Sequence, residues 1–143
     1  MPELNDKQKS GVDFITSVMG EKFGTAFRSA AESDRFGSLI TRMAASWAFH
    51  DVWQHEGLTR KEKSLVTIAA LIASRQPLEA RNHVKIGLAN GLTASELEGL
   101  LIQLSPYLGF PSVASGTTAV VEAMREAGAD PEDLQTAEEK GLL

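Results

Sequence analysis

The chain has 143 residues, of which 43% are hydrophobic and 23% charged, and its formal net charge is −5. This composition is typical of a globular protein that buries a core of its own, and the acidic balance argues against a nucleic-acid partner, because phosphate binding requires a basic face. The absence of cysteine excludes disulfides, thiolate nucleophiles and thiolate metal sites.

Apolar residues recur at helical spacing and strand signals are nearly absent, so the sequence predicts an all-α fold of six to seven helices. In chain order, we expect helices over residues 6–19, 22–32, 34–53, 60–75, 77–90, 94–105 and 111–127. Pro77 suits a first helical turn, Gly91 suits a helix stop, and Gly109-Phe110-Pro111 interrupts the chain before the last helix.

No linker or repeat divides the chain, which predicts one domain over residues 1–129 followed by an acidic tail over 130–143. The helix over 60–75 carries apolar residues around most of its circumference. Such a helix is buried on nearly all sides, and a chain of this size has few places to wrap one. We therefore expect a homo-oligomer in which another subunit supplies part of the covering.

The N-terminus lacks the basic flank and apolar run of a signal peptide. The longest apolar stretch, over residues 65–73, is too short to cross a bilayer. These features predict a cytoplasmic protein without a membrane partner.

Glu79 and His83 stand four residues apart in the helix expected over 77–90, so their side chains share one face. A carboxylate beside the ring would raise the imidazole pKa and give a proton donor and acceptor usable near neutral pH. Gly87, Asn90 and Gly91 follow on that face and would leave room for a ligand. From spacing alone, however, an ordinary exposed ion pair is the better explanation.

The other two histidines, His50 and His55, lie on either side of Trp53. No fixed metal-ligand spacing joins the histidines, so we predict no metal site. A helix-end or surface position explains each histidine better than ligation. Trp53 is better explained as a core or interface anchor than as part of a substrate cage.

Three segments together resemble the carboxymuconolactone decarboxylase family over roughly residues 34–125: the run from Trp53 to Leu71, the run from Glu79 to Gly91, and Tyr107-Leu-Gly-Phe-Pro111. The resemblance implies an all-α fold built on a helical hairpin and assembled as trimers or hexamers. An alkylhydroperoxidase D-like branch of this fold carries Cys-x-x-Cys-x-x-x-His. Here Gln76 and Glu79 stand at the cysteine positions, so the peroxide chemistry of that branch is excluded.

The decarboxylase branch implies catalytic roles for His83 and Glu79 and a reaction without any cofactor. Its substrate is a small anionic acid, a carboxylated butenolide lactone of aromatic catabolism. The candidates for binding it are Lys63, Arg60, Arg81, His55 and Trp53.

Lys63 replaces the usual arginine of the branch, and His55-Glu56 replaces an Arg-Pro pair. A lysine can pair with a carboxylate but cannot grip it with two parallel hydrogen bonds. These departures leave two alternatives open. One is a cofactor-free proton-transfer reaction, such as an isomerisation, a lactone opening or another decarboxylation, on a different small acid. The other is a non-catalytic helical oligomer that binds a ligand.

Overall fold

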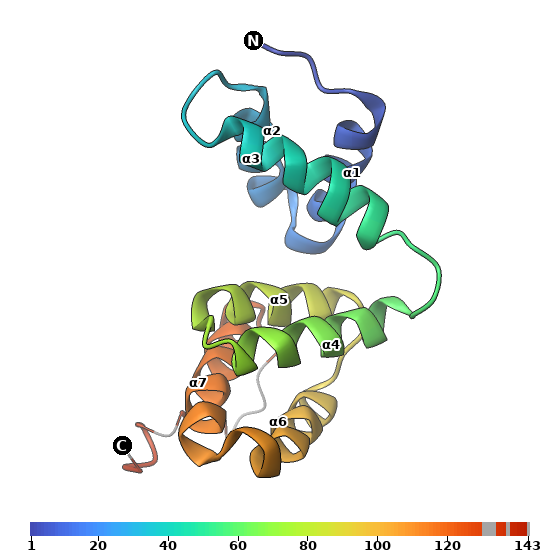
Figure 1. The fold of residues 1–143 in the computed structure, drawn as a ribbon. Coiled ribbons are helices and arrows are strands. Elements are labelled where there is room, and N and C mark those ends of the chain that lie inside the picture. The colour runs from blue at the N-terminus through green and yellow to red at the C-terminus, as the bar shows by residue number, and fades with distance from the viewer. Residues whose placement is uncertain (130–133, 137, 143) are drawn as a thin grey trace. The chain divides into compact units, whose positions relative to one another are not determined.

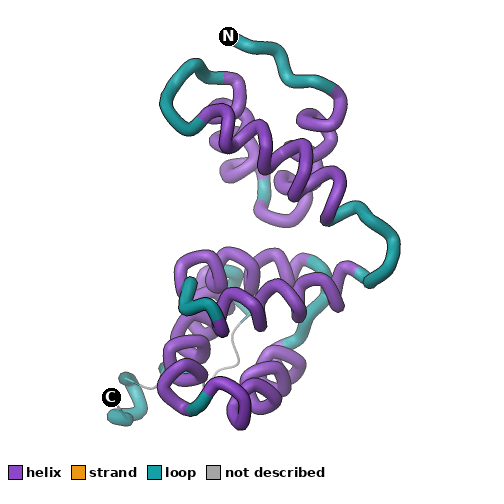
Figure 2. The backbone as a smooth tube through the Cα atoms, viewed as in Figure 1, coloured by secondary structure: helices purple, strands orange, loops and turns teal. Residues whose placement is uncertain are grey.

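The computed structural model describes residues 1–129, 134–136 and 138–142. Within these residues it has seven α-helices, one π-helical segment and no strand, which confirms the predicted all-α class (Figure 2). The chain divides into two compact units, Met1–Thr59 and Arg60–Leu143 (Figure 1). The expectation of one domain over residues 1–129 stays a prediction.

The N-terminal unit consists of α1 (Asp6–Met19), α2 (Glu21–Glu32), α3 (Ser38–Met43) and the π-helical segment η1 (Ala44–Val52). A capping box begins α1: the side chain of Asn5 accepts a hydrogen bond from the backbone N–H of Gln8, and the Gln8 side chain bonds back to Asn5 N–H. The apolar face of α1 packs on η1, and the buried side chains there include Val12 and Ala45.

The helix predicted over residues 34–53 begins later than expected. Gly37 has a φ of 89°, in the left-handed region that favours glycine, so the chain turns there and α3 starts at Ser38. From Ala44 the helix widens to the π pattern, as in the hydrogen bond from Trp53 N–H to the Ala48 carbonyl at 2.9 Å. Hydrophobic spacing alone could not distinguish this segment from an α-helix.

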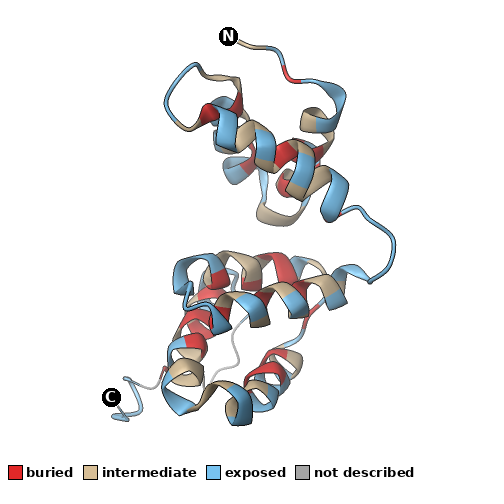
Figure 3. Ribbon diagram, viewed as in Figure 1, coloured by how far each residue is buried: buried red, intermediate tan, exposed pale blue. Residues whose placement is uncertain are grey.

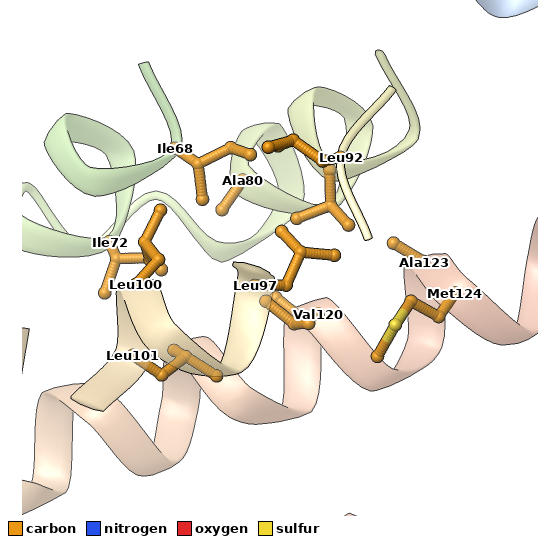
Figure 4. Close-up of a cluster of buried hydrophobic side chains, with 12 residues drawn as sticks. Ile68, Ile72, Ala80, Leu92, Leu97, Leu100, Leu101, Val120, Ala123 and Met124 are labelled. Carbon is orange, nitrogen blue, oxygen red and sulfur yellow. The ribbon is translucent and has the colours of Figure 1, made fainter. Parts of the chain in front are cut away.

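The C-terminal unit consists of α4 (Arg60–Ala73), α5 (Pro77–Ala89), α6 (Ala94–Leu108) and α7 (Phe110–Glu126). Pro77 in the first turn of α5 and Gly91 at a φ of 98° confirm the predicted boundaries of that helix. A single cluster of buried side chains joins all four helices (Figure 4), and it includes Ile68 from α4, Val84 from α5, Leu97 from α6 and Val120 from α7.

Helix α4 carries both buried and exposed residues within this unit (Figure 3). Ser64, Ile68 and Ile72 are buried along one face, whereas Val66 on another face is 59% exposed. The expected burial on nearly all sides is therefore wrong for the unit taken alone. Whether a second subunit covers the exposed face stays a prediction.

The described part of the predicted tail is tied to α7. The Arg125 guanidinium donates to both carboxylate oxygens of Glu139, at 2.8 and 2.6 Å, and to the carbonyl of Leu134 at 3.0 Å. These hydrogen bonds from Arg125, followed by one from the Thr136 N–H, lower the pKa of Glu139 to about 2. What the acidic tail prediction says of residues 130–133, 137 and 143 lies outside the described residues.

None of the helices in the described part of the chain combines the length and the apolar character that crossing a bilayer requires.

We expect Gly11→Ala to destabilise the N-terminal unit by about 2 kcal/mol or more. Gly11 is buried in α1, and a methyl group there would overlap the backbone carbonyl of Ala45 in η1, which cannot move aside cheaply. Urea unfolding followed by circular dichroism measures the change. The matched control is Gly99→Ala in α6, where an added methyl group meets no atom and should stabilise by up to about 1 kcal/mol. Equal effects of the two substitutions would contradict the close approach of α1 and η1.

Candidate active site

Helix α5 carries the predicted Glu79 and His83 pair in its first two turns. Glu79 is exposed, whereas His83 is half-buried and its Nδ1 atom is shielded from solvent. The buried residues of α5 include Ala80, Val84 and Gly87. The pair therefore lies at the boundary between the exposed and the buried face of α5, with the carboxylate of Glu79 exposed to solvent.

The electrostatics of His83 differ from the expectation. Burial lowers the pKa of the imidazole below its usual value of 6.5, and the negative charge of Glu79 raises the pKa by a smaller amount. The predicted net rise is therefore wrong, because desolvation of the ring outweighs the field of an exposed carboxylate that water screens. His83 is neutral at pH 7, and Glu79 favours its transient protonation.

The open floor expected beyond His83 is also absent at Gly87. An added methyl group there would come within 3.3 Å of the Cδ1 atom of Ile68 and 3.4 Å of the Cβ atom of Ser64, with Leu92 closer still. Side chains from α4 and Leu92 thus fill the space beside Gly87, and the missing Cβ allows α4 to pack closely against α5. The missing side chain makes room for a helix and not for a ligand.

Ser64 and Asn90 form a contact that sequence reasoning missed. The Asn90 side-chain amide donates a hydrogen bond of 3.1 Å to the hydroxyl of Ser64, which is completely buried. This hydrogen bond fixes the N-terminal part of α4 against the C-terminal end of α5. A lone serine on the buried face of an apolar helix was the available signal, because a buried hydroxyl needs a partner.

The predicted cationic ligands lie in different surroundings. Arg60 is exposed and Lys63 half-buried in the first turn of α4, and Lys63 directly precedes the fixed Ser64. Arg81 instead faces α7, where it forms ion pairs with Glu122, at 3.3 Å between Nη1 and Oε2, and with Glu126. The charge of Arg81 is already balanced, which argues against a role of Arg81 in holding a substrate carboxylate.

Trp53 and His55 belong to the N-terminal unit. Trp53 is buried, at 7% exposure, and its ring contacts Phe14 with a centroid distance of 5.7 Å. This packing agrees with its interpretation as a core anchor. His55 is exposed beyond the end of η1. A role of either residue in substrate binding stays a prediction.

The order of the helices agrees with the resemblance found in the sequence, because the Glu79 and His83 pair lies on the second helix of the α4–α5 hairpin. A sequence model of the carboxymuconolactone decarboxylase family matches residues 39–122. The chain belongs to the carboxymuconolactone decarboxylase family. It is 34% identical over 133 residues to the 4-carboxymuconolactone decarboxylase of Acinetobacter baylyi, a match that covers 92% of this chain and 98% of that protein. It is also 34% identical over 104 residues to the nitrosuccinic acid decarboxylase npaB of Metarhizium robertsii, covering 71% of this chain and 70% of that protein.

Membership of the carboxymuconolactone decarboxylase family confirms the predicted family and its decarboxylase branch. Both relatives are decarboxylases, and this family member is accordingly a carbon–carbon lyase. The predicted roles of individual residues stay predictions.

We expect His83 of this decarboxylase to titrate below 6.5, and Glu79→Gln to lower its pKa further, because the substitution removes the charge that favours the imidazolium. Proton NMR of the His83 ring over a pH series measures both values. His83 binds a proton less readily in the folded than in the unfolded chain, so its contribution to the free energy of unfolding falls as the pH drops below 6.5. A titration midpoint above 6.5 would contradict this description of the site.

The hydrogen bond between Asn90 and Ser64 should contribute about 1 kcal/mol to the stability of the decarboxylase, and leaving one buried partner unmatched should cost about 1–3 kcal/mol. Asn90→Ala and Ser64→Ala alone should each destabilise. The double variant should lose less than the sum of the two single losses. Strict additivity in urea unfolding would show that the two side chains do not interact.

Proposed function

We propose that the chain is a cofactor-independent decarboxylase of a carboxylated butenolide lactone in aromatic catabolism, like the 4-carboxymuconolactone decarboxylase that it matches over almost its full length. The observation that carries the proposal is the half-buried, neutral His83 with the exposed carboxylate of Glu79 one helical turn before it. This arrangement supports a proton relay beside a small anionic substrate.

The substrate supplies its own electron sink. When the bond between the ring γ-carbon and the leaving carboxylate breaks, its electron pair moves through the ring double bond to the lactone carbonyl oxygen, giving an oxyfuran anion and CO₂. A proton taken from solvent then adds to the ring carbon next to that carbonyl. The net change is loss of CO₂ and gain of one proton, with no oxidant or reductant.

In this proposal, His83 relays the proton. A ring that is neutral at pH 7 takes a proton from solvent and passes it to carbon, and Glu79 stabilises the imidazolium that forms in between. Lys63, with Arg60 beside it at the start of α4, holds the carboxylate that the substrate retains. Arg81 takes no part because Glu122 and Glu126 already balance its charge.

A second candidate reaction keeps this machinery and changes the acid. The nitrosuccinic acid decarboxylase relative supports it, since a nitro group, like a conjugated lactone carbonyl, can accept the electron pair left by CO₂. Lys63 also supports it, because a compact ammonium group binds a carboxylate with less directional demand than the arginine usual in the branch.

We further propose a homotrimer or homohexamer, supported by the exposed apolar side chains of Val66 on α4 and Phe110 on α7, which are 59% and 79% exposed. The cytoplasmic location expected from the sequence stays a prediction.

The deciding experiment incubates the purified chain with synthetic 4-carboxymuconolactone and, in a separate arm, with nitrosuccinic acid, and follows CO₂ release. Preference for the lactone supports the first reaction and preference for nitrosuccinic acid supports the second. Release of CO₂ from neither acid would contradict both.

We expect His83→Gln to lower turnover of the preferred acid about 10²-fold, because the relay loses its titrating group. The matched control is His50→Gln in the N-terminal unit, where the His50 ring contacts the Ser10 hydroxyl and takes no part in the proposed reaction. Its turnover should stay near the wild-type value. Unchanged turnover in a folded His83→Gln variant would remove His83 from the mechanism.

A further inference from the structure

The C-terminal unit contains a cavity of about 370 Å³ between the α4–α5 turn and the first turns of α7. Its walls carry the polar side chains of Arg75, Gln76, Ser112 and Ser115, and its floor includes the buried Ile72 and Ala80. The volume falls in the range that small-molecule sites occupy. Neither Glu79 nor His83 lines the cavity, so its occupant is a separate question from the reaction proposed above.

The charge at this cavity is unbalanced. Arg75 is the cation on its wall, and no aspartate or glutamate is among the lining residues. Within the described residues, the side chains of Arg75, Gln76, Ser112 and Ser115 form no hydrogen bond or ion pair with another protein group. The wall therefore offers donors to an anion that the protein itself does not supply.

The adjoining groove along α5 and α7 shows the opposite arrangement. Its arginine, Arg81, forms ion pairs with Glu122 and Glu126, and both Glu122 and Glu138 line the groove. Two cavities on one unit thus each contain an arginine, and only the one at Arg75 leaves the positive charge open to a ligand.

The backbone at Arg75 has an unusual conformation. Its φ is 57°, the only positive value at a residue other than glycine in the described chain, and the turn is closed by hydrogen bonds from Arg75 N–H to the Ile72 carbonyl at 3.1 Å and from Gln76 N–H to the Leu71 carbonyl at 2.9 Å. Glycine would adopt this conformation without strain. An arginine in this backbone conformation lowers stability, and backbone outliers of this kind cluster at functional sites.

From these observations we infer that this cavity binds a small organic monocarboxylate with an apolar body. Its carboxylate accepts hydrogen bonds from the Arg75 guanidinium and from the hydroxyls of Ser112 and Ser115. Its apolar part lies on Ile72 and Ala80. A ligand with two adjacent carboxylates is excluded, because the cavity wall has a single cation, Arg75, to balance them.

Sodium benzoate is the probe, titrated into the full ¹⁵N-labelled chain and followed by amide NMR. We expect saturable shifts at Ala80, Ser115 and Gly116, and at least tenfold weaker binding of benzamide, which has the same shape and no charge. Shifts that never saturate, shifts centred on His83, or equal binding of benzamide would each overturn the inference.

Arg75→Gly tests the guanidinium without a risk to folding, because glycine relieves the positive φ. The variant should unfold at the same or a higher urea concentration and bind benzoate tenfold or more weakly, the loss expected for one charge-assisted contact. Arg75→Lys should retain part of the affinity. The matched control, Arg35→Gln on the exposed loop before α3, removes one positive charge elsewhere and should leave benzoate binding unchanged. Unaltered affinity in Arg75→Gly would overturn the inference.

Discussion

The candidate site depends on how closely α4 and α5 pack. Gly87 allows Ile68 and Ser64 to approach the backbone of α5, and the hydrogen bond from Asn90 fixes the rotation of α4 about its axis. That rotation determines where Lys63 is directed, since Lys63 directly precedes the buried Ser64. Burial lowers the pKa of His83, which lies on α5. The candidate cation Lys63 and the proposed relay His83 therefore lie on the two helices of one pair.

Much of the architecture could be predicted from local signals. Pro77 and Gly91 mark where α5 begins and ends, and the structure places boundaries at these positions. Other features depend on tertiary contacts that no short segment contains. The π-helical hydrogen bonds of η1 and the left-handed backbone of Arg75 leave no trace in hydrophobic periodicity.

The candidate site shows the same limit. The spacing of Glu79 and His83 correctly places both on one helix. A pairwise argument then gives the wrong sign for the imidazole pKa, because it leaves out the burial of the ring. Spacing also identified Gly87 as open space, although α4 occupies that space. Arg81 and Lys63 were both candidate ligands in the sequence. The ion pairs of Arg81 with Glu122 and Glu126 on α7 could not be predicted from the sequence.

The hydrogen bonds from Arg125 to Glu139 form a clasp between α7 and the C-terminal segment. Leu134, on the segment that the clasp holds, packs against the core cluster of the C-terminal unit. Because Glu139 keeps its negative charge down to strongly acidic conditions, mild acid does not open the clasp. Shortening the chain after Ala129 would remove several acidic groups together with Leu134, and would expose the part of the core cluster that Leu134 covers.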